Sequence, residues 1–259
     1  MKKTLSILLA LLLTGMLAAC GNEATNDSAL EAAPSESPIE ETTTSETETP
    51  AAELVSIEPE FDLDAGTVTL NNGVSMPILG IGTFALSDSE AEESVYWALR
   101  DGYRLIDTAR IYGDEAGVGR GIRRAIDEGF VTREEIFVTT KMWTSDYDNG
   151  DAAINASLER LGLDYIDLMI LHHSQPENDV AAYKAMEQAV ADGRLKAIGL
   201  SNYYDPDDFD RMVNSTSILP AVLQNETHPY HQSADMKEHI AQYGTVLESW
   251  FPLGGRGNT

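Results

Sequence analysis

The chain has 259 residues, of which 42% are hydrophobic, so it can form one large domain or two small ones with a buried core. Its formal net charge of -26 argues against nucleic-acid binding, because an acidic surface repels phosphates. The single cysteine excludes an intrachain disulfide.

The segment 1–20 is typical of a secretion signal. Lys2 and Lys3 precede a mostly apolar stretch, 5–17, which is shorter than the ~20 residues that a membrane span needs. It ends in Leu17-Ala18-Ala19-Cys20, which resembles the lipobox of bacterial lipoproteins, where the cysteine is lipidated and becomes the mature N-terminus. We therefore expect a lipoprotein signal peptide at 1–20, with Cys20 anchoring the protein to the extracytoplasmic face of a bacterial cell membrane. The alternative is a plain secretory signal with an incidental cysteine.

Residues 21–64 are rich in Glu, Thr, Ser, Ala and Pro, and no Lys or Arg occurs between Lys3 and Arg100. Such a segment cannot bury enough apolar surface to offset its chain entropy. We expect a disordered acidic linker that holds a domain at 65–259 away from the membrane surface.

From residue 66 onward, strand-like segments alternate with helix-like ones. The segments 67–70 and 74–77 flank Asn72-Gly73 and predict a small hairpin at one end of the domain. The alternation after the hairpin predicts strands at 78–84, 104–108, 136–140, 166–171, 197–200, 221–224 and 245–248, and helices at 88–100, 116–128, 151–161, 180–192, 206–213 and 233–243.

These strands are apolar almost throughout, which favours a parallel α/β sheet covered by helices. Two architectures compete, an open doubly wound sheet and a closed (β/α)8 TIM barrel. The doubly wound fold needs a glycine-rich turn directly after its first strand, whereas Gly80 and Gly82 lie within that strand and the glycines of 117–121 follow a loop. The pattern therefore favours a barrel with an N-terminal β-hairpin.

Polar residues follow three consecutive predicted strands. Asp107 and Tyr112 come at and after the end of the second strand, Lys141 after the third and His172 after the fourth. Each residue alone has a simpler explanation, such as a helix cap, a packing side chain, a solvated amine or a histidine bonded to backbone. In a TIM barrel, however, the carboxyl ends of the strands carry the active site, and these four side chains would be neighbours there.

As a set, the four residues have the chemistry for reducing a carbonyl group. A tyrosine has a pKa of ~10 and is a weak acid, but a nearby ammonium favours its ionised form. We expect Asp107 to hold Lys141, Lys141 to lower the pKa of Tyr112, and His172 to hydrogen-bond the substrate oxygen. Tyr112 would then protonate the alkoxide as a hydride reaches the carbonyl carbon.

From about residue 70 to 257 the chain resembles the aldo-keto reductase family, because several segments are similar to that family's motifs and occur in its order. The segment 104–109 with Tyr112 resembles the one that carries the catalytic Asp and Tyr. Likewise, 140–143 resembles the segment with the catalytic Lys and a substrate-pocket Trp, and 167–172 the segment that ends in the catalytic His. The segments 198–203, 224–230 and 250–254 are similar to those that bind the nicotinamide.

This resemblance implies an oxidoreductase that transfers a hydride from NAD(P)H, most often NADPH, to an aldehyde or ketone without a metal. It implies Tyr112 as general acid and base, Lys141 and Asp107 as the residues that lower its pKa, and His172 with Trp143 at the substrate. The residues implied for cofactor binding are Ser201, Asn202 and Gln224 at the carboxamide, Trp250 on the nicotinamide ring, and Pro252 and Leu253 in the same segment.

The chain departs from the family pattern in two places. His173-Ser174-Gln175-Pro176 stands where the family often has Trp and Pro, and strand alternation favours His172 over His173 as the catalytic residue. The chain also ends at Thr259, after the seventh strand, whereas the family's C-terminal part holds the adenosine phosphate. We expect a longer enzyme, or a sheet completed by another chain, because an open barrel leaves two strand edges unpaired.

Two further functions remain open at this point. A catalytically idle, lipid-anchored surface protein would keep the barrel as a binding platform, although the complete set of polar residues argues against it. A metal-dependent barrel hydrolase is the weaker alternative, because His172-His173 has no matching His or carboxylate cluster at ligand spacing. No oligomeric state is predicted.

Overall fold

The computed structural model of the protein describes residues 58–254. The predicted signal peptide, with Cys20, and residues 21–57 of the predicted linker lie outside these residues. None of the helices between residues 58 and 254 has the length and apolar character that a membrane span requires.

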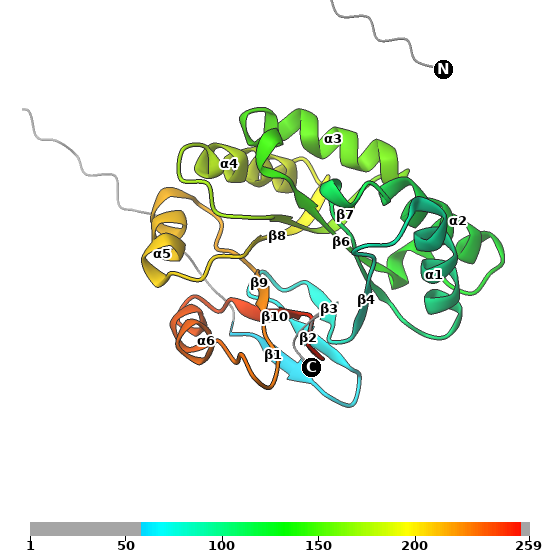
Figure 1. Ribbon diagram of the computed structural model, residues 1–259, viewed down its shortest axis with the longest axis horizontal. Coiled ribbons are helices and arrows are strands. Elements are labelled where there is room, and N and C mark those ends of the chain that lie inside the picture. The colour runs from blue at the N-terminus through cyan, green and yellow to red at the C-terminus, as the bar shows by residue number, and fades with distance from the viewer. Residues whose placement is uncertain (1–57, 255–259) are drawn as a thin grey trace, which may run out of the picture. The chain divides into compact units, whose positions relative to one another are not determined.

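The described residues form two sheets and a set of helices (Figure 1). An antiparallel sheet contains β1 (Glu60–Asp62), β2 (Thr67–Thr69) and β3 (Ser75–Pro77). A seven-stranded parallel sheet contains β4 (Gly80–Gly82), β5 (Leu105–Asp107), β6 (Phe137–Met142), β7 (Ile166–Leu171), β8 (Leu195–Ser201), β9 (Val222–Glu226) and β10 (Val246–Trp250). The helices between its strands are α1 (Asp88–Arg100), α2 (Glu115–Asp127), α3 (Gly150–Leu161), α4 (Asp179–Ala191), α5 (Pro206–Ser215) and α6 (Ala234–Ala241).

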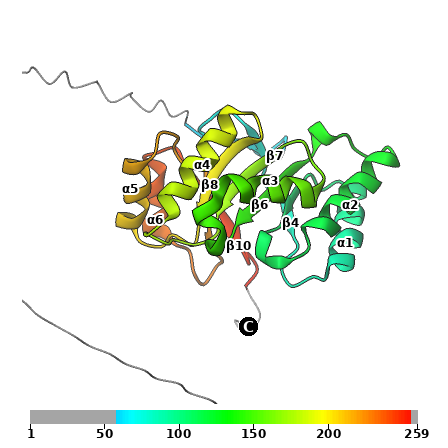
Figure 2. The same cartoon turned by 90° about the horizontal axis from the view of Figure 1, so that it is seen from above.

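The order of strands in the large sheet follows the chain, from β4 to β10, so each connecting helix crosses between neighbouring parallel strands. The sheet curls, and the helices follow one another around its outside, from α1 and α2 at one end to α5 and α6 at the other (Figures 1 and 2). This is the architecture of a (β/α)8 barrel without its eighth strand, and it confirms the predicted barrel over the doubly wound sheet. Within residues 58–254, β4 and β10 are not paired with each other.

Each predicted helix and each predicted parallel strand is present, with ends displaced by up to a few residues. The first strand differs most, because only Gly80–Gly82 of the predicted 78–84 pairs with a neighbour. Ile78, Leu79 and Phe84 are exposed. This strand pairs only with β5, which is itself three residues long, so the hydrogen-bonded ladder cannot extend further.

The predicted linker is wrong at its C-terminal end. Glu60–Asp62, which fall within the range 21–64 assigned to disorder, form β1 and pair with β2. All three residues are exposed, so backbone hydrogen bonds and not burial hold the strand, and composition does not reveal it. The hairpin of β2 and β3 is confirmed, with Gly73 at a φ of 83° in its turn.

The first helix shows how local sequence sets an element's limits. Ser87 and Glu90 form a reciprocal capping box, in which each side chain satisfies the backbone N–H of the other, and α1 begins there. Val95 and Leu99, one helical turn apart, are fully buried against the sheet. Helix formation and packing on the sheet are therefore encoded in the same segment.

The glycines of 117–121 serve helix packing. A Cβ atom on Gly117 would collide with the carbonyl oxygen of Asp88 in α1, and one on Gly119 would collide with that of Leu161 at the end of α3. These glycines allow α2 to approach both neighbouring backbones. Their spacing is thus explained without a dinucleotide fingerprint.

Alternation along the strands divides the core into two layers. Side chains on the outer face of the sheet, such as Ile106, Val138 and Met169, pack under the helices. Their sequence neighbours face inward and pack against the hairpin at the amino ends of the strands, in a cluster that contains Val68, Leu70, Met76, Leu105, Phe137, Leu168, Ile170, Ala197, Ala221, Val222 and Val246. The hairpin therefore closes the amino end of the sheet with apolar side chains.

Candidate active site

The strand register brings polar residues to the inside of the sheet at its carboxyl end. Leu105 and Phe137 face inward at the start of β5 and β6. Because side chains alternate with a period of two, Asp107 and Lys141 lie on the same inward face, two and four residues further on. The sequence pattern that builds the apolar core thus also aims these charges into the interior.

Lys141 connects the candidate catalytic residues. The side chain is almost fully buried, and its Nζ donates hydrogen bonds to Asp107 Oδ1 at 2.6 Å and to the backbone oxygen of Thr108 at 3.0 Å. It also donates to the Tyr112 hydroxyl at 3.3 Å. The structure therefore brings Asp107, Lys141 and Tyr112 into one hydrogen-bonded chain.

Tyr112 lies on a loop that is held at both ends. It ends the short 3-10 helix Arg110–Tyr112, which follows β5. Thr108 Oγ1 donates to Asp114 Oδ1 at 2.7 Å, and Thr140 Oγ1 donates to Glu115 Oε1 at 2.7 Å, with both acids buried. Since these bonds tie the loop to its own start and to β6, the phenol is presented to Lys141 in one position.

The pKa of Tyr112 differs from the sequence-based expectation. Burial raises this pKa, the Lys141 ammonium lowers it, the Asp107 carboxylate raises it, and the net result is a rise. Lys141 lowers the pKa of Tyr112, as the sequence predicted, but burial has the larger effect, and the extent of burial is not readable from sequence. Tyr112 is therefore protonated at neutral pH, which is the form that can donate a proton.

Lys141 is charged despite its burial. Burial alone would lower the pKa of Lys141, but the Asp107 carboxylate and the Tyr112 hydroxyl outweigh it and raise the pKa. A permanent ammonium next to the phenol stabilises a tyrosinate formed when the proton leaves. Burial thus keeps Tyr112 protonated, while the Lys141 ammonium favours a tyrosinate if the proton is lost.

His172 directly follows β7 and is only 8% exposed. Burial lowers its pKa to about 3, with further lowering by the Lys141 ammonium and by His173. Its imidazole is therefore neutral near pH 7 and can donate one N–H. The rings of Tyr112 and His172 meet edge to face, with centroids 5.9 Å apart, so both donors border the same space.

Trp143 and His173 lie beside His172. The Trp143 ring meets His172 at 5.1 Å and His173 at 5.4 Å between centroids, and the two imidazoles stack at 5.0 Å. The backbone oxygen of His173 accepts a bond from Tyr147 at 2.7 Å, which fixes the segment after β7. Trp143 therefore lies next to the donor pair.

The residues implied for cofactor binding follow the next strands. Asn202 is held in the left-handed region, at a φ of 59°, and bridges Ser201 Oγ, the backbone oxygen of His172 and the indole N–H of Trp250. Gln224 does not join this group but donates from Nε2 to Asp107 Oδ2 at 2.9 Å. Pro252 and Leu253 are exposed, Leu253 at 96%.

These side chains fit a nicotinamide carboxamide, because they supply a hydroxyl and two amides at adjacent strand ends with an indole beside them. The positive φ of Asn202 indicates a local backbone strain that its surrounding bonds sustain. Functional groups held in this way are typical of binding sites, and we assign Ser201, Asn202 and Trp250 to a candidate cofactor surface.

Sequence reasoning missed three side chains at this end of the sheet. Phe84 contacts Tyr112 with ring centroids 5.2 Å apart, and Phe251 contacts Phe84 at 6.0 Å. These two rings follow β4 and β10, the first and last strands of the parallel sheet, so no pattern in the sequence indicated that they would meet. The third, Glu248, ends the predicted strand 245–248 on the same inward face as Val246, and that alternation was the available signal.

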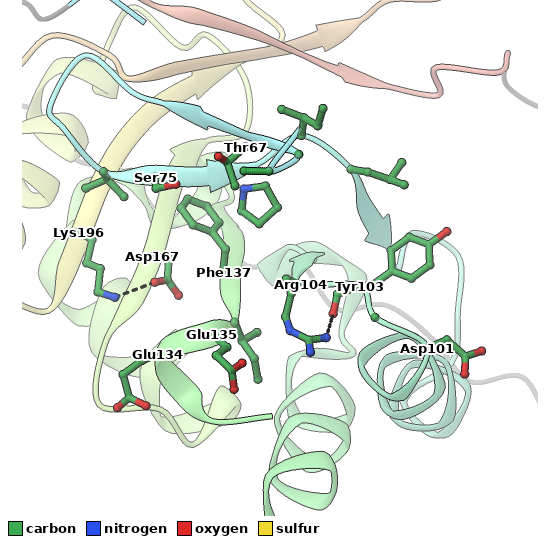
Figure 3. Close-up of a pocket in the computed structure, with 18 residues that line it drawn as sticks. Thr67, Ser75, Asp101, Tyr103, Arg104, Glu134, Glu135, Phe137, Asp167 and Lys196 are labelled. Atoms are coloured by element: carbon green, nitrogen blue, oxygen red, sulfur yellow. Dashed lines mark hydrogen bonds and ion pairs between the residues drawn. The ribbon is translucent and has the colours of Figure 1, made fainter. Parts of the chain in front are cut away.

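A large hollow lies at the opposite end of the sheet. This cavity, of about 820 Å³, is lined by the hairpin and by loops at the amino ends of the strands, including Arg104, Phe137, Asp167 and Lys196 (Figure 3). Asp167 is held by Lys196 at 3.0 Å, as the figure shows, and by Arg133 at 2.7 Å. None of the candidate catalytic residues lines it, so chemistry and not volume identifies the active site.

The described residues contain no group of three or more His, Cys, Asp or Glu side chains placed to hold a metal ion. The weaker hydrolase alternative therefore has no metal centre within residues 58–254.

Comparison with known proteins assigns the family. The sequence model of the Aldo/keto reductase family matches residues 78–258, and the chain belongs to this family. The chain is 44% identical over 197 residues to morphine 6-dehydrogenase of Pseudomonas putida, an alignment that covers 74% of this chain and 64% of that protein. This chain thus spans slightly less than two thirds of that relative's length.

Solved structures agree with this assignment. The crystal structure of an aldo/keto reductase from Brucella melitensis matches with a TM-score of 0.69 and 37% identity, covering 74% of this chain and 75% of that one. The crystal structure of a Bombyx mori aldo-keto reductase in complex with NADP matches with a TM-score of 0.69 and 35% identity, covering 74% and 69%. The family consists of oxidoreductases that use NADP(H).

Proposed function

We propose that this protein reduces an aldehyde or ketone with a hydride from NADPH, or alternatively from NADH, and that Tyr112 is the general acid. The observation that carries the proposal is the hydrogen-bonded chain from Asp107 through Lys141 to Tyr112. Neutral His172 beside the phenol supplies a second donor. Membership of the Aldo/keto reductase family supports the same reaction class.

In the proposed mechanism, the substrate oxygen accepts hydrogen bonds from the Tyr112 hydroxyl and the His172 imidazole. The bound reduced nicotinamide supplies the hydride. As negative charge grows on the substrate oxygen, Tyr112 transfers its proton to that oxygen, and the product leaves as an alcohol. Lys141 stabilises the remaining tyrosinate, and Asp107 fixes Lys141 in place.

The cofactor assignment within this proposal uses the candidate cofactor surface. Ser201 and Asn202 would bind the carboxamide, and Trp250 would stack on the nicotinamide ring. Gln224 would either give up its hydrogen bond to Asp107 and bind the carboxamide, or bind both groups at once. The second is possible because its side-chain amide has two N–H donors and an acceptor oxygen. Their placement at the ends of β8, β9 and β10 supports a cofactor that enters from the carboxyl end of the sheet.

Replacing Tyr112 with Phe in the full-length protein tests the proposal. Loss of NADPH absorbance with an aromatic aldehyde would be followed for the wild type, for Tyr112→Phe and for Tyr96→Phe. Tyr96 is a matched control, because its hydroxyl bonds Glu128 on the helical side of the domain. We expect a loss of about 10² to 10⁴ in rate for Tyr112→Phe, the range of general acid catalysis, and little change for Tyr96→Phe.

Equal rates for the wild type and Tyr112→Phe would remove Tyr112 from the mechanism. A full-length protein that neither turns over nor binds nucleotide would instead favour the idle surface protein.

We further propose that Cys20 is lipidated and holds the protein at the extracytoplasmic face of a bacterial membrane. The support is the match of Leu17-Ala18-Ala19-Cys20 to a lipobox. Mass spectrometry of the native N-terminus and membrane fractionation of a Cys20→Ala variant test this. An unmodified N-terminus, or a variant that fractionates with the membrane as the wild type does, would contradict it.

A further inference from the structure

Glu248 is a half-buried acid with one buried carboxyl oxygen, and the proposed mechanism leaves it without a role. It lies in β10 at the position paired with Gln224 of β9, and both side chains face the interior. Its Oε2 atom is buried and makes no hydrogen bond within the described residues. An acid oxygen in that condition is unusual, because burying a polar group without a partner costs stability.

The surroundings of Glu248 connect it to the catalytic chain from two sides. Gln224, its pairing partner, donates a hydrogen bond to Asp107 Oδ2 at 2.9 Å. Lys141, which bonds Asp107 Oδ1 at 2.6 Å, attracts the Glu248 carboxylate and is attracted by it. Asp107 on β5 and Glu248 on β10 thus both influence the Lys141 ammonium, the first through a hydrogen bond and the second through its charge.

The charged groups around Glu248 are therefore unbalanced when it is ionised. Burial raises its pKa to about 7, and the Asp107 carboxylate adds to the rise, whereas the Gln224 amide and the Lys141 ammonium oppose it. Below that pH, Asp107 and Lys141 balance each other. Above it, two carboxylates share one ammonium, and less positive potential remains at the Tyr112 hydroxyl.

We propose that Glu248 is a positioning residue of the reductase site, which acts on Tyr112 through Lys141 and Gln224, and that its ionisation slows proton donation by Tyr112. This inference rests on the proposed function. Protonated Glu248 leaves Lys141 to favour the tyrosinate that forms as the proton leaves. Ionised Glu248 opposes that anion, so Tyr112 becomes a weaker acid and reduction slows as pH rises through the neutral range.

The test compares wild type, Glu248→Gln and Glu226→Gln in the full-length protein. Glutamine keeps the size of the side chain and removes its charge. Glu226 is the matched control, because it is a half-buried acid at the end of β9, two residues beyond Gln224, and it pairs with Trp250 and bonds His228. The rate of hydride transfer to an aromatic aldehyde would be measured from about pH 5 to about pH 9, with deuterated cofactor to isolate the chemical step.

We expect the wild type and Glu226→Gln to lose activity roughly threefold through neutral pH, as Brønsted behaviour gives for a tyrosine that weakens by about one pKa unit. Glu248→Gln should lack this inflection. An inflection that survives in Glu248→Gln, or one that is absent from the wild type, would overturn the proposal.

Infrared spectroscopy separates failure of this inference from failure of the proposed function, because it needs no turnover. The carbonyl band of a protonated carboxyl should be present in the wild type at acid pH, disappear through neutral pH and be absent from Glu248→Gln. Lack of turnover in every variant, wild type included, would overturn the reductase and this role with it, while the band still reports the proton on Glu248. Turnover without the band would overturn the role of Glu248 alone.

Discussion

The two ends of the parallel sheet use the same strands for opposite purposes. At the amino end, inward side chains such as Phe137 and Leu168 pack against the hairpin in an apolar cluster. At the carboxyl end, four residues further along β6, Lys141 lies inside with Asp107, and Glu248 Oε2 and His172 Nδ1 have no hydrogen-bond partners among the described residues. The apolar packing that stabilises the fold is concentrated at the amino end. These two polar atoms lie at the carboxyl end.

This difference shows how one alternation pattern serves both purposes. Inward side chains are apolar near the amino ends of the strands, where they pack against the hairpin, and include Asp107 and Lys141 near the carboxyl ends. Burial raises the pKa of Tyr112 and lowers that of His172, because removing either side chain from water disfavours its charged form.

Lys141→Met should have the largest effect, because it removes the ammonium that joins the charged residues at the carboxyl end of the sheet. It leaves the partly buried Asp107 without its ammonium and Tyr112 without support for its anion. We expect a rate loss of about 10² to 10⁴ and a stability loss of about 3 kcal/mol, as for other broken buried pairs. Urea unfolding and the reductase assay measure the two effects.

The double variant Asp107→Asn with Lys141→Met is the control for this prediction. It removes both charges and should regain part of the stability but none of the activity. A single Lys141→Met variant with near wild-type turnover would contradict the proposed role of the ammonium.

Phe137→Ala should damage the apolar end alone. Phe137 is 4% exposed and belongs to the inner cluster with the hairpin. Its truncation should cost about 3 to 5 kcal/mol of unfolding free energy through lost burial and a cavity. The kcat/KM of the folded fraction should change little, since Phe137 touches none of the catalytic side chains. A large fall in kcat with unchanged stability would show that the two ends are not separate.

The pH dependence of stability gives the smallest and most specific test, at His172. Its folded-state pKa of about 3 lies below its unfolded value of 6.5, so the unfolded chain binds more protons between these values. Unfolding free energy should therefore fall by a few kcal/mol as pH decreases from 6.5 towards 3. Urea unfolding of the wild type and His172→Gln at several pH values measures this.

In His172→Gln, the acid-induced loss should be smaller than in the wild type, because the titrating imidazole is gone. His173→Gln is the control, since burial also lowers the pKa of His173 and its own contribution must be distinguished. Parallel curves for wild type and His172→Gln would show that His172 is not buried in its neutral form.

Much of the fold and the reacting residues could be predicted from local patterns. The hydrophobic periodicity located the strands and helices, and the spacing of Asp107, Tyr112, Lys141 and His172 after successive strands placed them at one end of the sheet. Strand β1 could not be predicted, because exposed Glu60–Asp62 are held only by backbone pairing with β2. The contact of Phe84 with Phe251 was equally hidden, since it joins loops far apart in the chain.

The sequence by itself determined the parallel α/β architecture, the inward alternation and the identity of the reacting groups. Each of these depends on residue type and spacing within a few neighbours. Only the tertiary structure decided the protonation of those groups: that Tyr112 is a weaker acid than a free phenol, that Gln224 bonds Asp107, and that the Glu248 carboxylate raises the pKa of Lys141. A pKa sums burial and charges brought together from distant strands, and that sum exists only once the sheet has curled.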